Sequence, residues 1–322
     1  MKTINKPFLK TCDEIINDVW QVEHPEASCN AAPTFTRSIK GIGDLANHYD
    51  AFLVDQWGVL HNGHAPYPGV VQCLKRLAWA GKQVIIISNS GKRSDGNEAR
   101  MKKLGFPRSS YKHLVTSGEI AWQMLETGSG VIGEFHRAPC LLLTSDPSDT
   151  FAQGLTVPFV ESIEQAGLIL LAGIDDSRSS SFYEDIIEEG VARKLPLVCT
   201  NPDLTRITAN GLQPSAGAIA QTYQERGGKV HFIGKPYPEI YQYCLTLVPN
   251  VPASRILAVG DSLHHDITGG MSVGLNTLLT LNGVHADHFV DTIDPLEINQ
   301  RIGKISGSKD ALPDWVVSSF QW

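Results

Sequence analysis

Short apolar segments alternate with amphipathic, helix-like segments along most of this chain, and this alternation constrains the fold more than any other feature. The pattern predicts strands at 51–54, 83–88, 140–144, 168–174, 195–200, 230–234, 255–260 and 276–281. It predicts helices at 12–22, 68–81, 94–105, 116–128, 180–194 and 238–248, with a further short helix from Asp266. Strands that alternate with helices form mainly parallel sheets covered on both faces. The sequence therefore predicts an α/β protein with a doubly wound parallel core.

The composition is typical of a globular protein and disfavours a surface for nucleic acid or membrane. Apolar residues make up 42% of the 322 residues, charged residues 19%, and the formal net charge is −7, which argues against binding to polyanions. No apolar run has the length of a membrane span, and residues 1–20 lack the apolar centre of a signal peptide. The six cysteines are scattered without a C-x-x-C pair, so we expect reduced thiols and a cytoplasmic protein.

Polar side chains follow four of the predicted strands at their carboxyl ends. These residues are Asp55; Ser88, Asn89 and Ser90; Lys235; and Asp261, with Asp266 five residues later. Because functional groups gather at the carboxyl edge of a parallel sheet, we expect these side chains to converge.

Converging carboxylates repel one another unless a cation lies among them, and oxygen ligands favour Mg²⁺ next to phosphate. Lys235 and the Ser88 hydroxyl would supply positive charge and a hydrogen-bond donor to a phosphoryl group. The backbone amides of the turn from Asp55 to Gly58 would donate to the same group. A carboxylate such as Asp55 in this setting can attack phosphorus and form an aspartyl-phosphate.

These residues, in this order, resemble the motifs of the haloacid dehalogenase-like (HAD) hydrolase superfamily. Asp55 matches its first motif, Ser88 the second, Lys235 the third, and "GDSLHHD", which ends at Asp266, the acidic fourth. Three stretches, "IISNSGKRS…KKLGF", "TNPDLT" and "IGKPYPEIY", are similar to the class IIA branch with NagD-type and pyridoxal phosphate phosphatase-type phosphatases. The resemblance spans roughly 45–285 and implies a Rossmann-like HAD core with an inserted α/β cap.

The resemblance also implies a role for each matching residue. Asp55 would be the nucleophile, and Ser88 and Lys235 would complete the catalytic set. Asp55, Asp261 and the backbone carbonyl of Trp57 would hold Mg²⁺, with Asp266 in support. The residues expected to contact the substrate are Trp57, Gly58, Asn89, Ser90, Asn201 and Asp203.

One position departs from most phosphatases of this superfamily. They have a second Asp two residues after the first, which protonates the leaving group and then activates water, whereas this chain has Trp57 there. An indole cannot perform either step, and general acid–base catalysis contributes roughly 10²–10⁴-fold to a rate. The indole can instead pack against a flat or apolar substrate.

Three functions stay open on this basis. The first, which we prefer, is a phosphatase of a small phosphorylated metabolite such as a sugar phosphate or nucleotide. It would favour good leaving groups or use another acid, such as His61 or His64. The second is a catalytically weak or inactive protein that binds phosphorylated metabolites. The third is a dehalogenase-like hydrolase, which the intact fourth motif disfavours because attack on carbon needs no Mg²⁺.

The resemblance predicts how the chain is organised. We expect an N-terminal extension at 1–44, a core formed by 45–130 and 216–290, a cap at 131–215, and a C-terminal tail at 291–322 that packs on the core. Hinges near 130 and 215 would let the cap close and exclude water. By analogy with caps of this branch, we also expect a homodimer.

Overall fold

The computed structural model describes residues 35–145, 150–208, 211–306 and 312–322, and the helix expected at 12–22 lies outside these ranges. The chain divides into two compact units. The core unit comprises the described residues of 23–88, 94–115 and 235–322, and the insert unit comprises those of 89–93 and 116–234. The predicted cap boundaries near 130 and 215 are a different division of the chain from these compact units, and they stay a prediction.

A seven-stranded sheet organises the core unit. Its strands, in spatial order, are β1 (Arg37–Ser38), β14 (Trp315–Val317), β13 (Asn276–Thr280), β12 (Ile256–Gly260), β2 (Ala51–Asp55), β3 (Gln83–Ser88) and β4 (His113–Thr116). The pairs from β1 through to β3 are parallel. Every residue of β2 and β12 is buried, which requires cover on both faces of the sheet.

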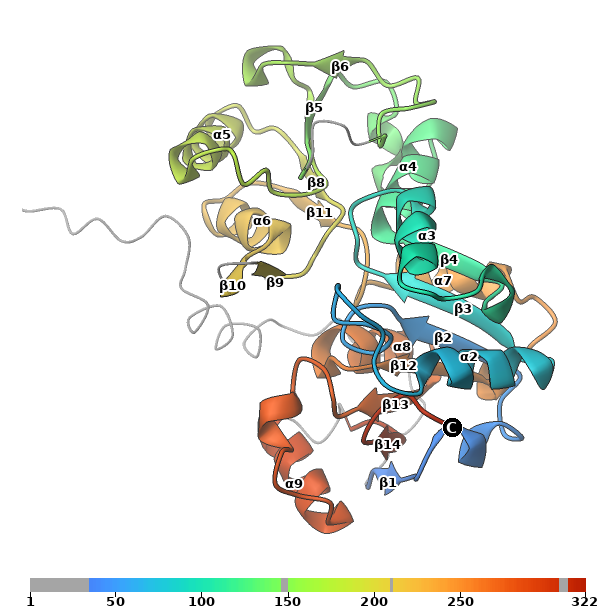
Figure 1. The fold of residues 1–322 in the computed structure, drawn as a ribbon. Coiled ribbons are helices and arrows are strands. Elements are labelled where there is room, and N and C mark those ends of the chain that lie inside the picture. Colours follow the sequence, from blue (N-terminus) through green and yellow to red (C-terminus); the bar gives the residue numbers. More distant parts are fainter. Residues whose placement is uncertain (1–34, 146–149, 209–210, 307–311) are drawn as a thin grey trace, which may run out of the picture. The chain divides into compact units, whose positions relative to one another are not determined.

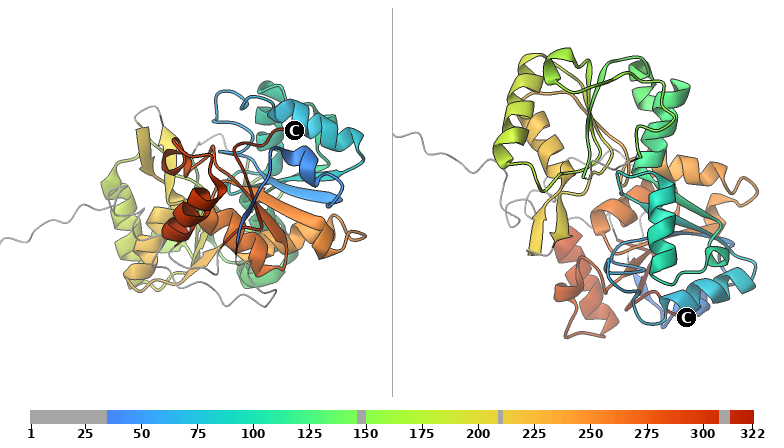
Figure 2. Two further views of the ribbon diagram at one scale, coloured as in Figure 1. Left: turned by 90° about the horizontal axis from the view of Figure 1, so that it is seen from below. Right: turned by 45° about the horizontal axis from the view of Figure 1, so that its top comes forward.

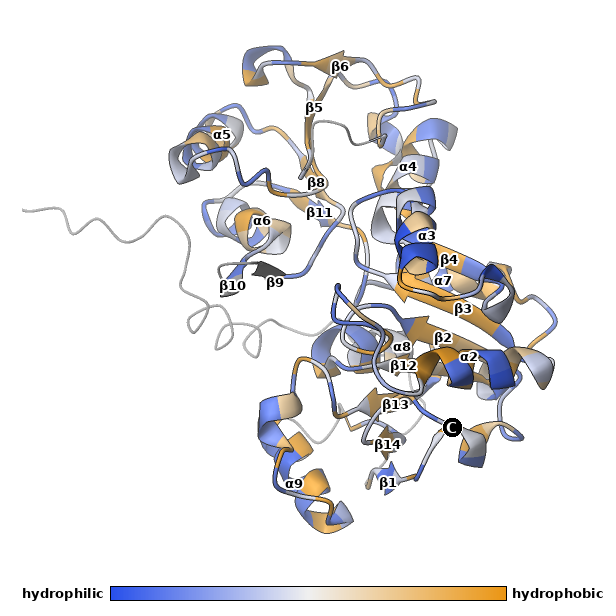
Figure 3. Ribbon diagram, in the orientation of Figure 1, coloured by the Kyte–Doolittle hydropathy of each residue, from blue (hydrophilic) through white to orange (hydrophobic). Residues whose placement is uncertain are grey.

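Helices provide this cover. The helices of the core unit are α2 (Val70–Trp79), α3 (Ser94–Lys103), α7 (Pro238–Thr246), α8 (Gly269–Ser272) and α9 (Pro295–Ser306). Leu74 of α2 and Met101 of α3 belong to one buried cluster with Val259 of the sheet. On the opposite face, α8 approaches so closely that a Cβ at Gly270 would touch Ala258. The central strands β2 and β3 are strongly apolar (Figures 1 and 3).

The insert unit contains its own sheet of five parallel strands. In spatial order these are β11 (Val230–Phe232), β8 (Leu197–Cys199), β7 (Leu168–Leu171), β5 (Cys140–Leu143) and β6 (Phe159–Val160). A separate antiparallel pair is formed by β9 (Thr205–Thr208) and β10 (Gly211–Pro214). Helices α5 (Ser180–Ala192) and α6 (Ala216–Glu225) share a buried cluster with the sheet, and α4 (Ser117–Thr127) lies on its other face (Figure 2).

The predicted α/β fold with a doubly wound parallel core is confirmed, with one strand assigned to the wrong sheet. The sequence predicts that the strand at 230–234 ends at the same sheet edge as Asp55. This prediction is wrong, because β11 pairs with β8 in the insert unit. The C-terminal tail does more than pack on the core, since it supplies α9 and also β14, which pairs with β13.

The described cysteines fit the expectation of reduced thiols. Cys73, Cys140, Cys199 and Cys244 are all buried and free. Burial raises the pKa of Cys140 to about 12, so this thiol is neutral and unreactive near neutral pH. In the ranges that the structure describes, no helix combines the length and the apolar character of a membrane span.

Candidate active site

The register of three neighbouring strands brings Asp55, Ser88 and Asp261 to one edge of the seven-stranded sheet. Asp55, the last residue of β2, pairs with Ile87 of β3, so Ser88 is the next residue along the adjacent strand. On the other side of β2, strand β12 ends at Gly260, and Asp261 follows directly. Three of the four polar strand ends that the sequence predicts therefore meet at this edge.

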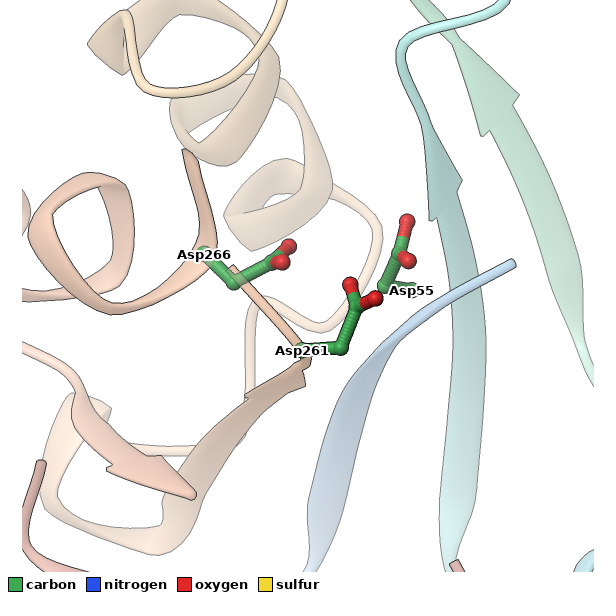
Figure 4. Close-up of side chains that lie close together, drawn as sticks. All are labelled: Asp55, Asp261 and Asp266. Atoms are coloured by element: carbon green, nitrogen blue, oxygen red, sulfur yellow. The ribbon is translucent and has the colours of Figure 1, made fainter. Parts of the chain in front are cut away.

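Three carboxylates converge at this edge. Asp55, Asp261 and Asp266 each offer an oxygen, and these oxygens all lie within 4.8 Å of one another. Figure 4 shows the three side chains directed towards one volume from the ends of β2 and β12 and from the helical turn at Leu263–Thr268. All three residues are buried, so their charges are poorly screened by water.

Lys235 connects two of these carboxylates. Its Nζ lies 2.5 Å from Oδ1 of Asp55 and 2.7 Å from Oδ1 of Asp266, and the residue is only 3% exposed. Burial disfavours the ammonium, but the charges of Asp266 and Asp55 outweigh it and raise the pKa of Lys235 well above its usual value. Lys235 is therefore a fixed cation that orients the carboxylate of Asp55.

Backbone groups hold the other two acids in place. The amide of Val284 donates to Oδ2 of Asp261 at 2.7 Å, and the amide of Ser262 donates to Oδ2 of Asp266 at 3.1 Å. Gly58 has a φ of 82°, and a Cβ there would overlap with the carboxylate of Asp261. A glycine is therefore required at this position by both conformation and space.

The donor set fits a divalent cation. Three buried carboxylates share one ammonium, so the cluster lacks positive charge. Burial raises the pKa of Asp55 well above its usual value, although the Lys235 ammonium opposes the shift. Burial, and then the charge of Asp266, raise the pKa of Asp261 to about 7. A hard cation among these oxygens would stabilise their ionised forms, and an all-oxygen set of this kind suits Mg²⁺.

Trp57 lies on the turn after Asp55 and is 39% exposed. The guanidinium of Arg100 lies 5.1 Å from the centre of its ring, and the ring of His61 packs edge-on at 5.0 Å. The outer ring also lies against Gly63, where a Cβ would come within 2.5 Å of it. The indole is therefore held on several sides and keeps an exposed surface.

His61 is a poor substitute for the missing acid. Its ring is fully buried, and Nδ1 accepts a hydrogen bond from the amide of Gly63 at 3.0 Å. Burial, and then the charge of Arg100, lower the pKa of His61 to about 4. The ring is therefore neutral near pH 7 and has no readily donated proton. His64 is exposed on the following loop.

Four of the predicted substrate-binding residues lie in the insert unit: Asn89, Ser90, Asn201 and Asp203. Nδ2 of Asn89 donates to Oδ1 of Asp203 at 2.8 Å, and Oδ1 of Asn201 accepts from the amide of Asp203 at 3.2 Å. The carbonyl of Ser90 accepts from the amide of Gly118 at 3.1 Å. Three of them thus form one polar cluster within this unit, and their contact with substrate stays a prediction.

Sequence reasoning missed two groups in the core unit. The amide of Val284 holds Asp261, and it follows β13, so the rule that located Asp55 at a strand end applied here too. Arg100 gave no such signal, because a basic residue in the last turn of α3 is ordinary for a helix C-terminus. Only the three-dimensional structure places it beside Trp57.

Comparison with known proteins agrees with this geometry. The family model described as haloacid dehalogenase-like hydrolase matches residues 52–155, and a second HAD-hydrolase-like model matches 232–301. Chronophin of Homo sapiens is 30% identical over 260 residues, covering 75% of this chain and 84% of its own length. Glycerol-3-phosphate phosphatase of Gallus gallus is 29% identical over 267 residues, covering 74% and 81%.

A solved structure agrees as well. A haloacid dehalogenase-like hydrolase from Brucella suis has a TM-score of 0.72 and 27% identity, and the match covers 87% of this chain and 99% of that one. The strand order, the cluster of acids at the strand ends and these matches lead to one assignment. The chain belongs to the haloacid dehalogenase-like hydrolase family.

Proposed function

We propose that this protein is a Mg²⁺-dependent phosphatase that acts on a small phosphorylated metabolite through an aspartyl-phosphate at Asp55. The observation that carries the proposal is the buried group of Asp55, Lys235, Asp261 and Asp266, with Lys235 at 2.5 Å from the proposed nucleophile. The relatives support it, because glycerol-3-phosphate phosphatase of Gallus gallus is named for this kind of reaction.

In the first step, an oxygen of Asp55 attacks phosphorus, and the bond from phosphorus to the leaving oxygen breaks. Lys235 holds the attacking carboxylate, and the Ser88 hydroxyl orients the phosphoryl oxygens, whereas the amide of Gly58 donates to the carbonyl of His61 at 3.1 Å. Mg²⁺, when bound by Asp55, Asp261 and the carbonyl of Trp57, supplies positive charge to the phosphoryl group. Asp266 fixes Lys235 from the other side at 2.7 Å.

The absence of an acid at Trp57 shapes both steps. The leaving oxygen departs without a proton from this position, so esters of acidic alcohols such as phenols react faster than alkyl esters. In the second step, water attacks phosphorus, and the bond from phosphorus to Asp55 breaks. No carboxylate at position 57 takes the proton from this water, so we propose that the aspartyl-phosphate accumulates.

The remaining assignments belong to the same proposal. Asn89, Ser90, Asn201 and Asp203 are proposed to contact the substrate, and the family resemblance implies that Asn201 and Asp203 belong to a cap domain. We also propose that the protein acts in the cytoplasm and forms a homodimer. The polar cluster around Asp203 supports a binding role for this part of the insert unit.

The test is phosphate release from phenyl phosphate and from an alkyl ester such as glycerol 3-phosphate, with and without Mg²⁺. Metal-dependent release from phenyl phosphate that is much faster than from the alkyl ester supports the proposal. Equal rates would mean that another group supplies the acid. If neither ester is hydrolysed but phosphorylated metabolites bind tightly, the protein is a binding protein, a function that the neutral His61 and the indole at position 57 would favour.

A further inference from the structure

Trp57 offers a rigid aromatic surface next to the proposed nucleophile. The indole is fixed by the ring of His61 and by the backbone at Gly63, and His61 in turn packs against Phe106 at 6.3 Å. Its exposed part is thus backed by buried side chains, so a bound ring would not need to order it first.

This surface also carries a positive charge. Arg100 is exposed, and its guanidinium lies 5.1 Å from the centre of the Trp57 ring. The Arg93 guanidinium, which lies over Trp122, is neutralised by Glu119 at 2.7 Å. Within the described ranges Arg100 forms no such salt bridge with an acidic side chain. Its charge therefore remains available to an anion in solution.

The surface lies within reach of the leaving group. Trp57 follows Asp55 by two residues, and two residues span at most about 7 Å. The residue after Trp57, Gly58, lies so close to Asp261 that a Cβ there would overlap with its carboxylate, which ties the turn that carries Trp57 to the carboxylate cluster. A phosphoryl group at Asp55 would therefore place its ester substituent near the indole, and the Arg100 guanidinium lies over that same indole ring.

We propose that Trp57 and Arg100 together recognise the leaving group, and that the substrate carries a planar ring with a second anionic group, such as a carboxylate, in addition to its phosphate. This inference rests on the proposed phosphatase function and names the substrate class of the same site. The ring packs on the indole, and the second anion pairs with the Arg100 guanidinium. A planar, electron-poor leaving group also matches a site that has no acid to protonate it.

The experiment compares phenyl phosphate with 4-carboxyphenyl phosphate, which carries a second anionic group on the same aromatic ring. The protein variants are Arg100→Gln and, as a control, Lys103→Gln, which removes the same charge from an exposed position of the same helix. We expect Arg100→Gln to lower kcat/KM for the carboxylated ester about fivefold and to leave phenyl phosphate nearly unchanged. Lys103→Gln should leave the ratio of the two esters at the wild-type value.

Two results would overturn the inference while leaving the phosphatase assignment intact. One is an equal effect of Arg100→Gln on both esters, and the other is an equal change of the ratio in Lys103→Gln, which would indicate only a general surface potential. Trp57→Leu should lower kcat/KM for both esters, because it removes the aromatic surface on which their rings pack.

A binding measurement keeps the inference separate from turnover. Calorimetric titration of both esters into Asp55→Asn, with and without Arg100→Gln, requires no hydrolysis. Tighter binding of the carboxylated ester that is lost with Arg100→Gln supports the inference, even if the wild-type protein hydrolyses neither ester and the proposed function fails. Absence of any such preference in Asp55→Asn overturns the inference.

Discussion

The two ends of strand β2 each have an acid in opposite surroundings. Asp50, just before the strand, is hydrogen-bonded by the side chains of Arg255 and Lys82, and its side chain is 41% exposed. Asp55, at the other end, lies in a buried cluster with two further acids and the cation Lys235. The Asp50 end of β2 is therefore rich in cations and open to water, whereas the Asp55 end is rich in acids and shielded from water.

The two acids consequently shift in opposite directions. The hydrogen bond from Arg255 lowers the pKa of Asp50 well below its usual value, whereas burial raises the pKa of Asp55 well above it. The first arrangement favours the folded state near neutral pH, although weakly because water screens it. The second arrangement, with three buried acids close together, is unfavourable unless a further cation binds among them. An unfavourable arrangement of this kind is characteristic of a functional site, and the difference distinguishes the structural acid Asp50 from Asp55, the proposed nucleophile.

The largest effect is expected from a change at the Asp55 end of strand β2. Asp55→Asn removes the proposed nucleophile, and we expect phosphate release to fall by about 10³-fold or more. The melting temperature should not fall, because the change removes a buried charge. Activity that survives in this variant, measured with phenyl phosphate and Mg²⁺, would contradict the nucleophile assignment.

A second change introduces the acid that the Asp55 end of β2 lacks. Trp57→Asp introduces a carboxyl two residues after the nucleophile, and we expect about a 10²-fold faster hydrolysis of alkyl esters. The wild type should show a burst of phenol equal to the enzyme concentration, followed by slow turnover, whereas the variant should show none. Trp57→Asn, which cannot exchange a proton, is the control. A variant no faster than the wild type would mean that the indole contributes more through binding than an acid contributes through proton transfer.

The stabilisation of the folded protein by Mg²⁺ should depend on pH, because the proposed metal site lies at the acid-rich end of β2. The pKa of Asp261 is raised to about 7 by burial, so without metal the folded state binds a proton there, and its stability falls as pH rises from about 4 through 7. Mg²⁺ competes with this proton, and we expect a saturating concentration to raise the melting temperature by about 5 °C at pH 8 and by less at pH 6. Asp261→Asn should remove this difference. Equal shifts at both pH values in the wild type would speak against Asp261 as a ligand.

The smallest effect is expected at the hydrated end. Asp50→Asn should leave phosphate release unchanged and lower the melting temperature only slightly. The pKa of Asp50 is lowered by Arg255, so its contribution is complete above about pH 4, the unfolded value, and is lost as pH falls through the folded value. High salt should also reduce the difference between variant and wild type. A loss of activity in this variant would show that the two ends are coupled.

The elements that the sequence predicts well are those whose pattern is local. The runs "AFLVD" and "QVIIIS" are recognisable because fully buried parallel strands are continuously apolar. Strands of two or three residues such as β1 and β14 carry no periodicity, and they were missed. The sheet to which β11 belongs depends on its partner β8, and a local pattern holds no information on that choice.

The same distinction applies to the site. Asp55, Ser88 and Asp261 were predictable because each follows a recognisable strand, and the order of the acids and Lys235 gave the family. The burial of His61 and the position of Arg100 over Trp57 arise from packing between segments distant in sequence. Tertiary contacts of this kind decide protonation and specificity, so residue type alone cannot predict them.

The neighbours of β2 have a consequence for the order in which the chain can fold during synthesis. The strands of the five-stranded sheet all lie between Cys140 and Phe232, so this sheet can form once that segment has left the ribosome. Strand β2 emerges much earlier, but one of its partners, β12, begins only at Ile256. Contacts of such long range form late. The edge where Asp55 meets Asp261 is therefore completed only after the insert unit has been made, and an incomplete chain cannot assemble this cluster of acids.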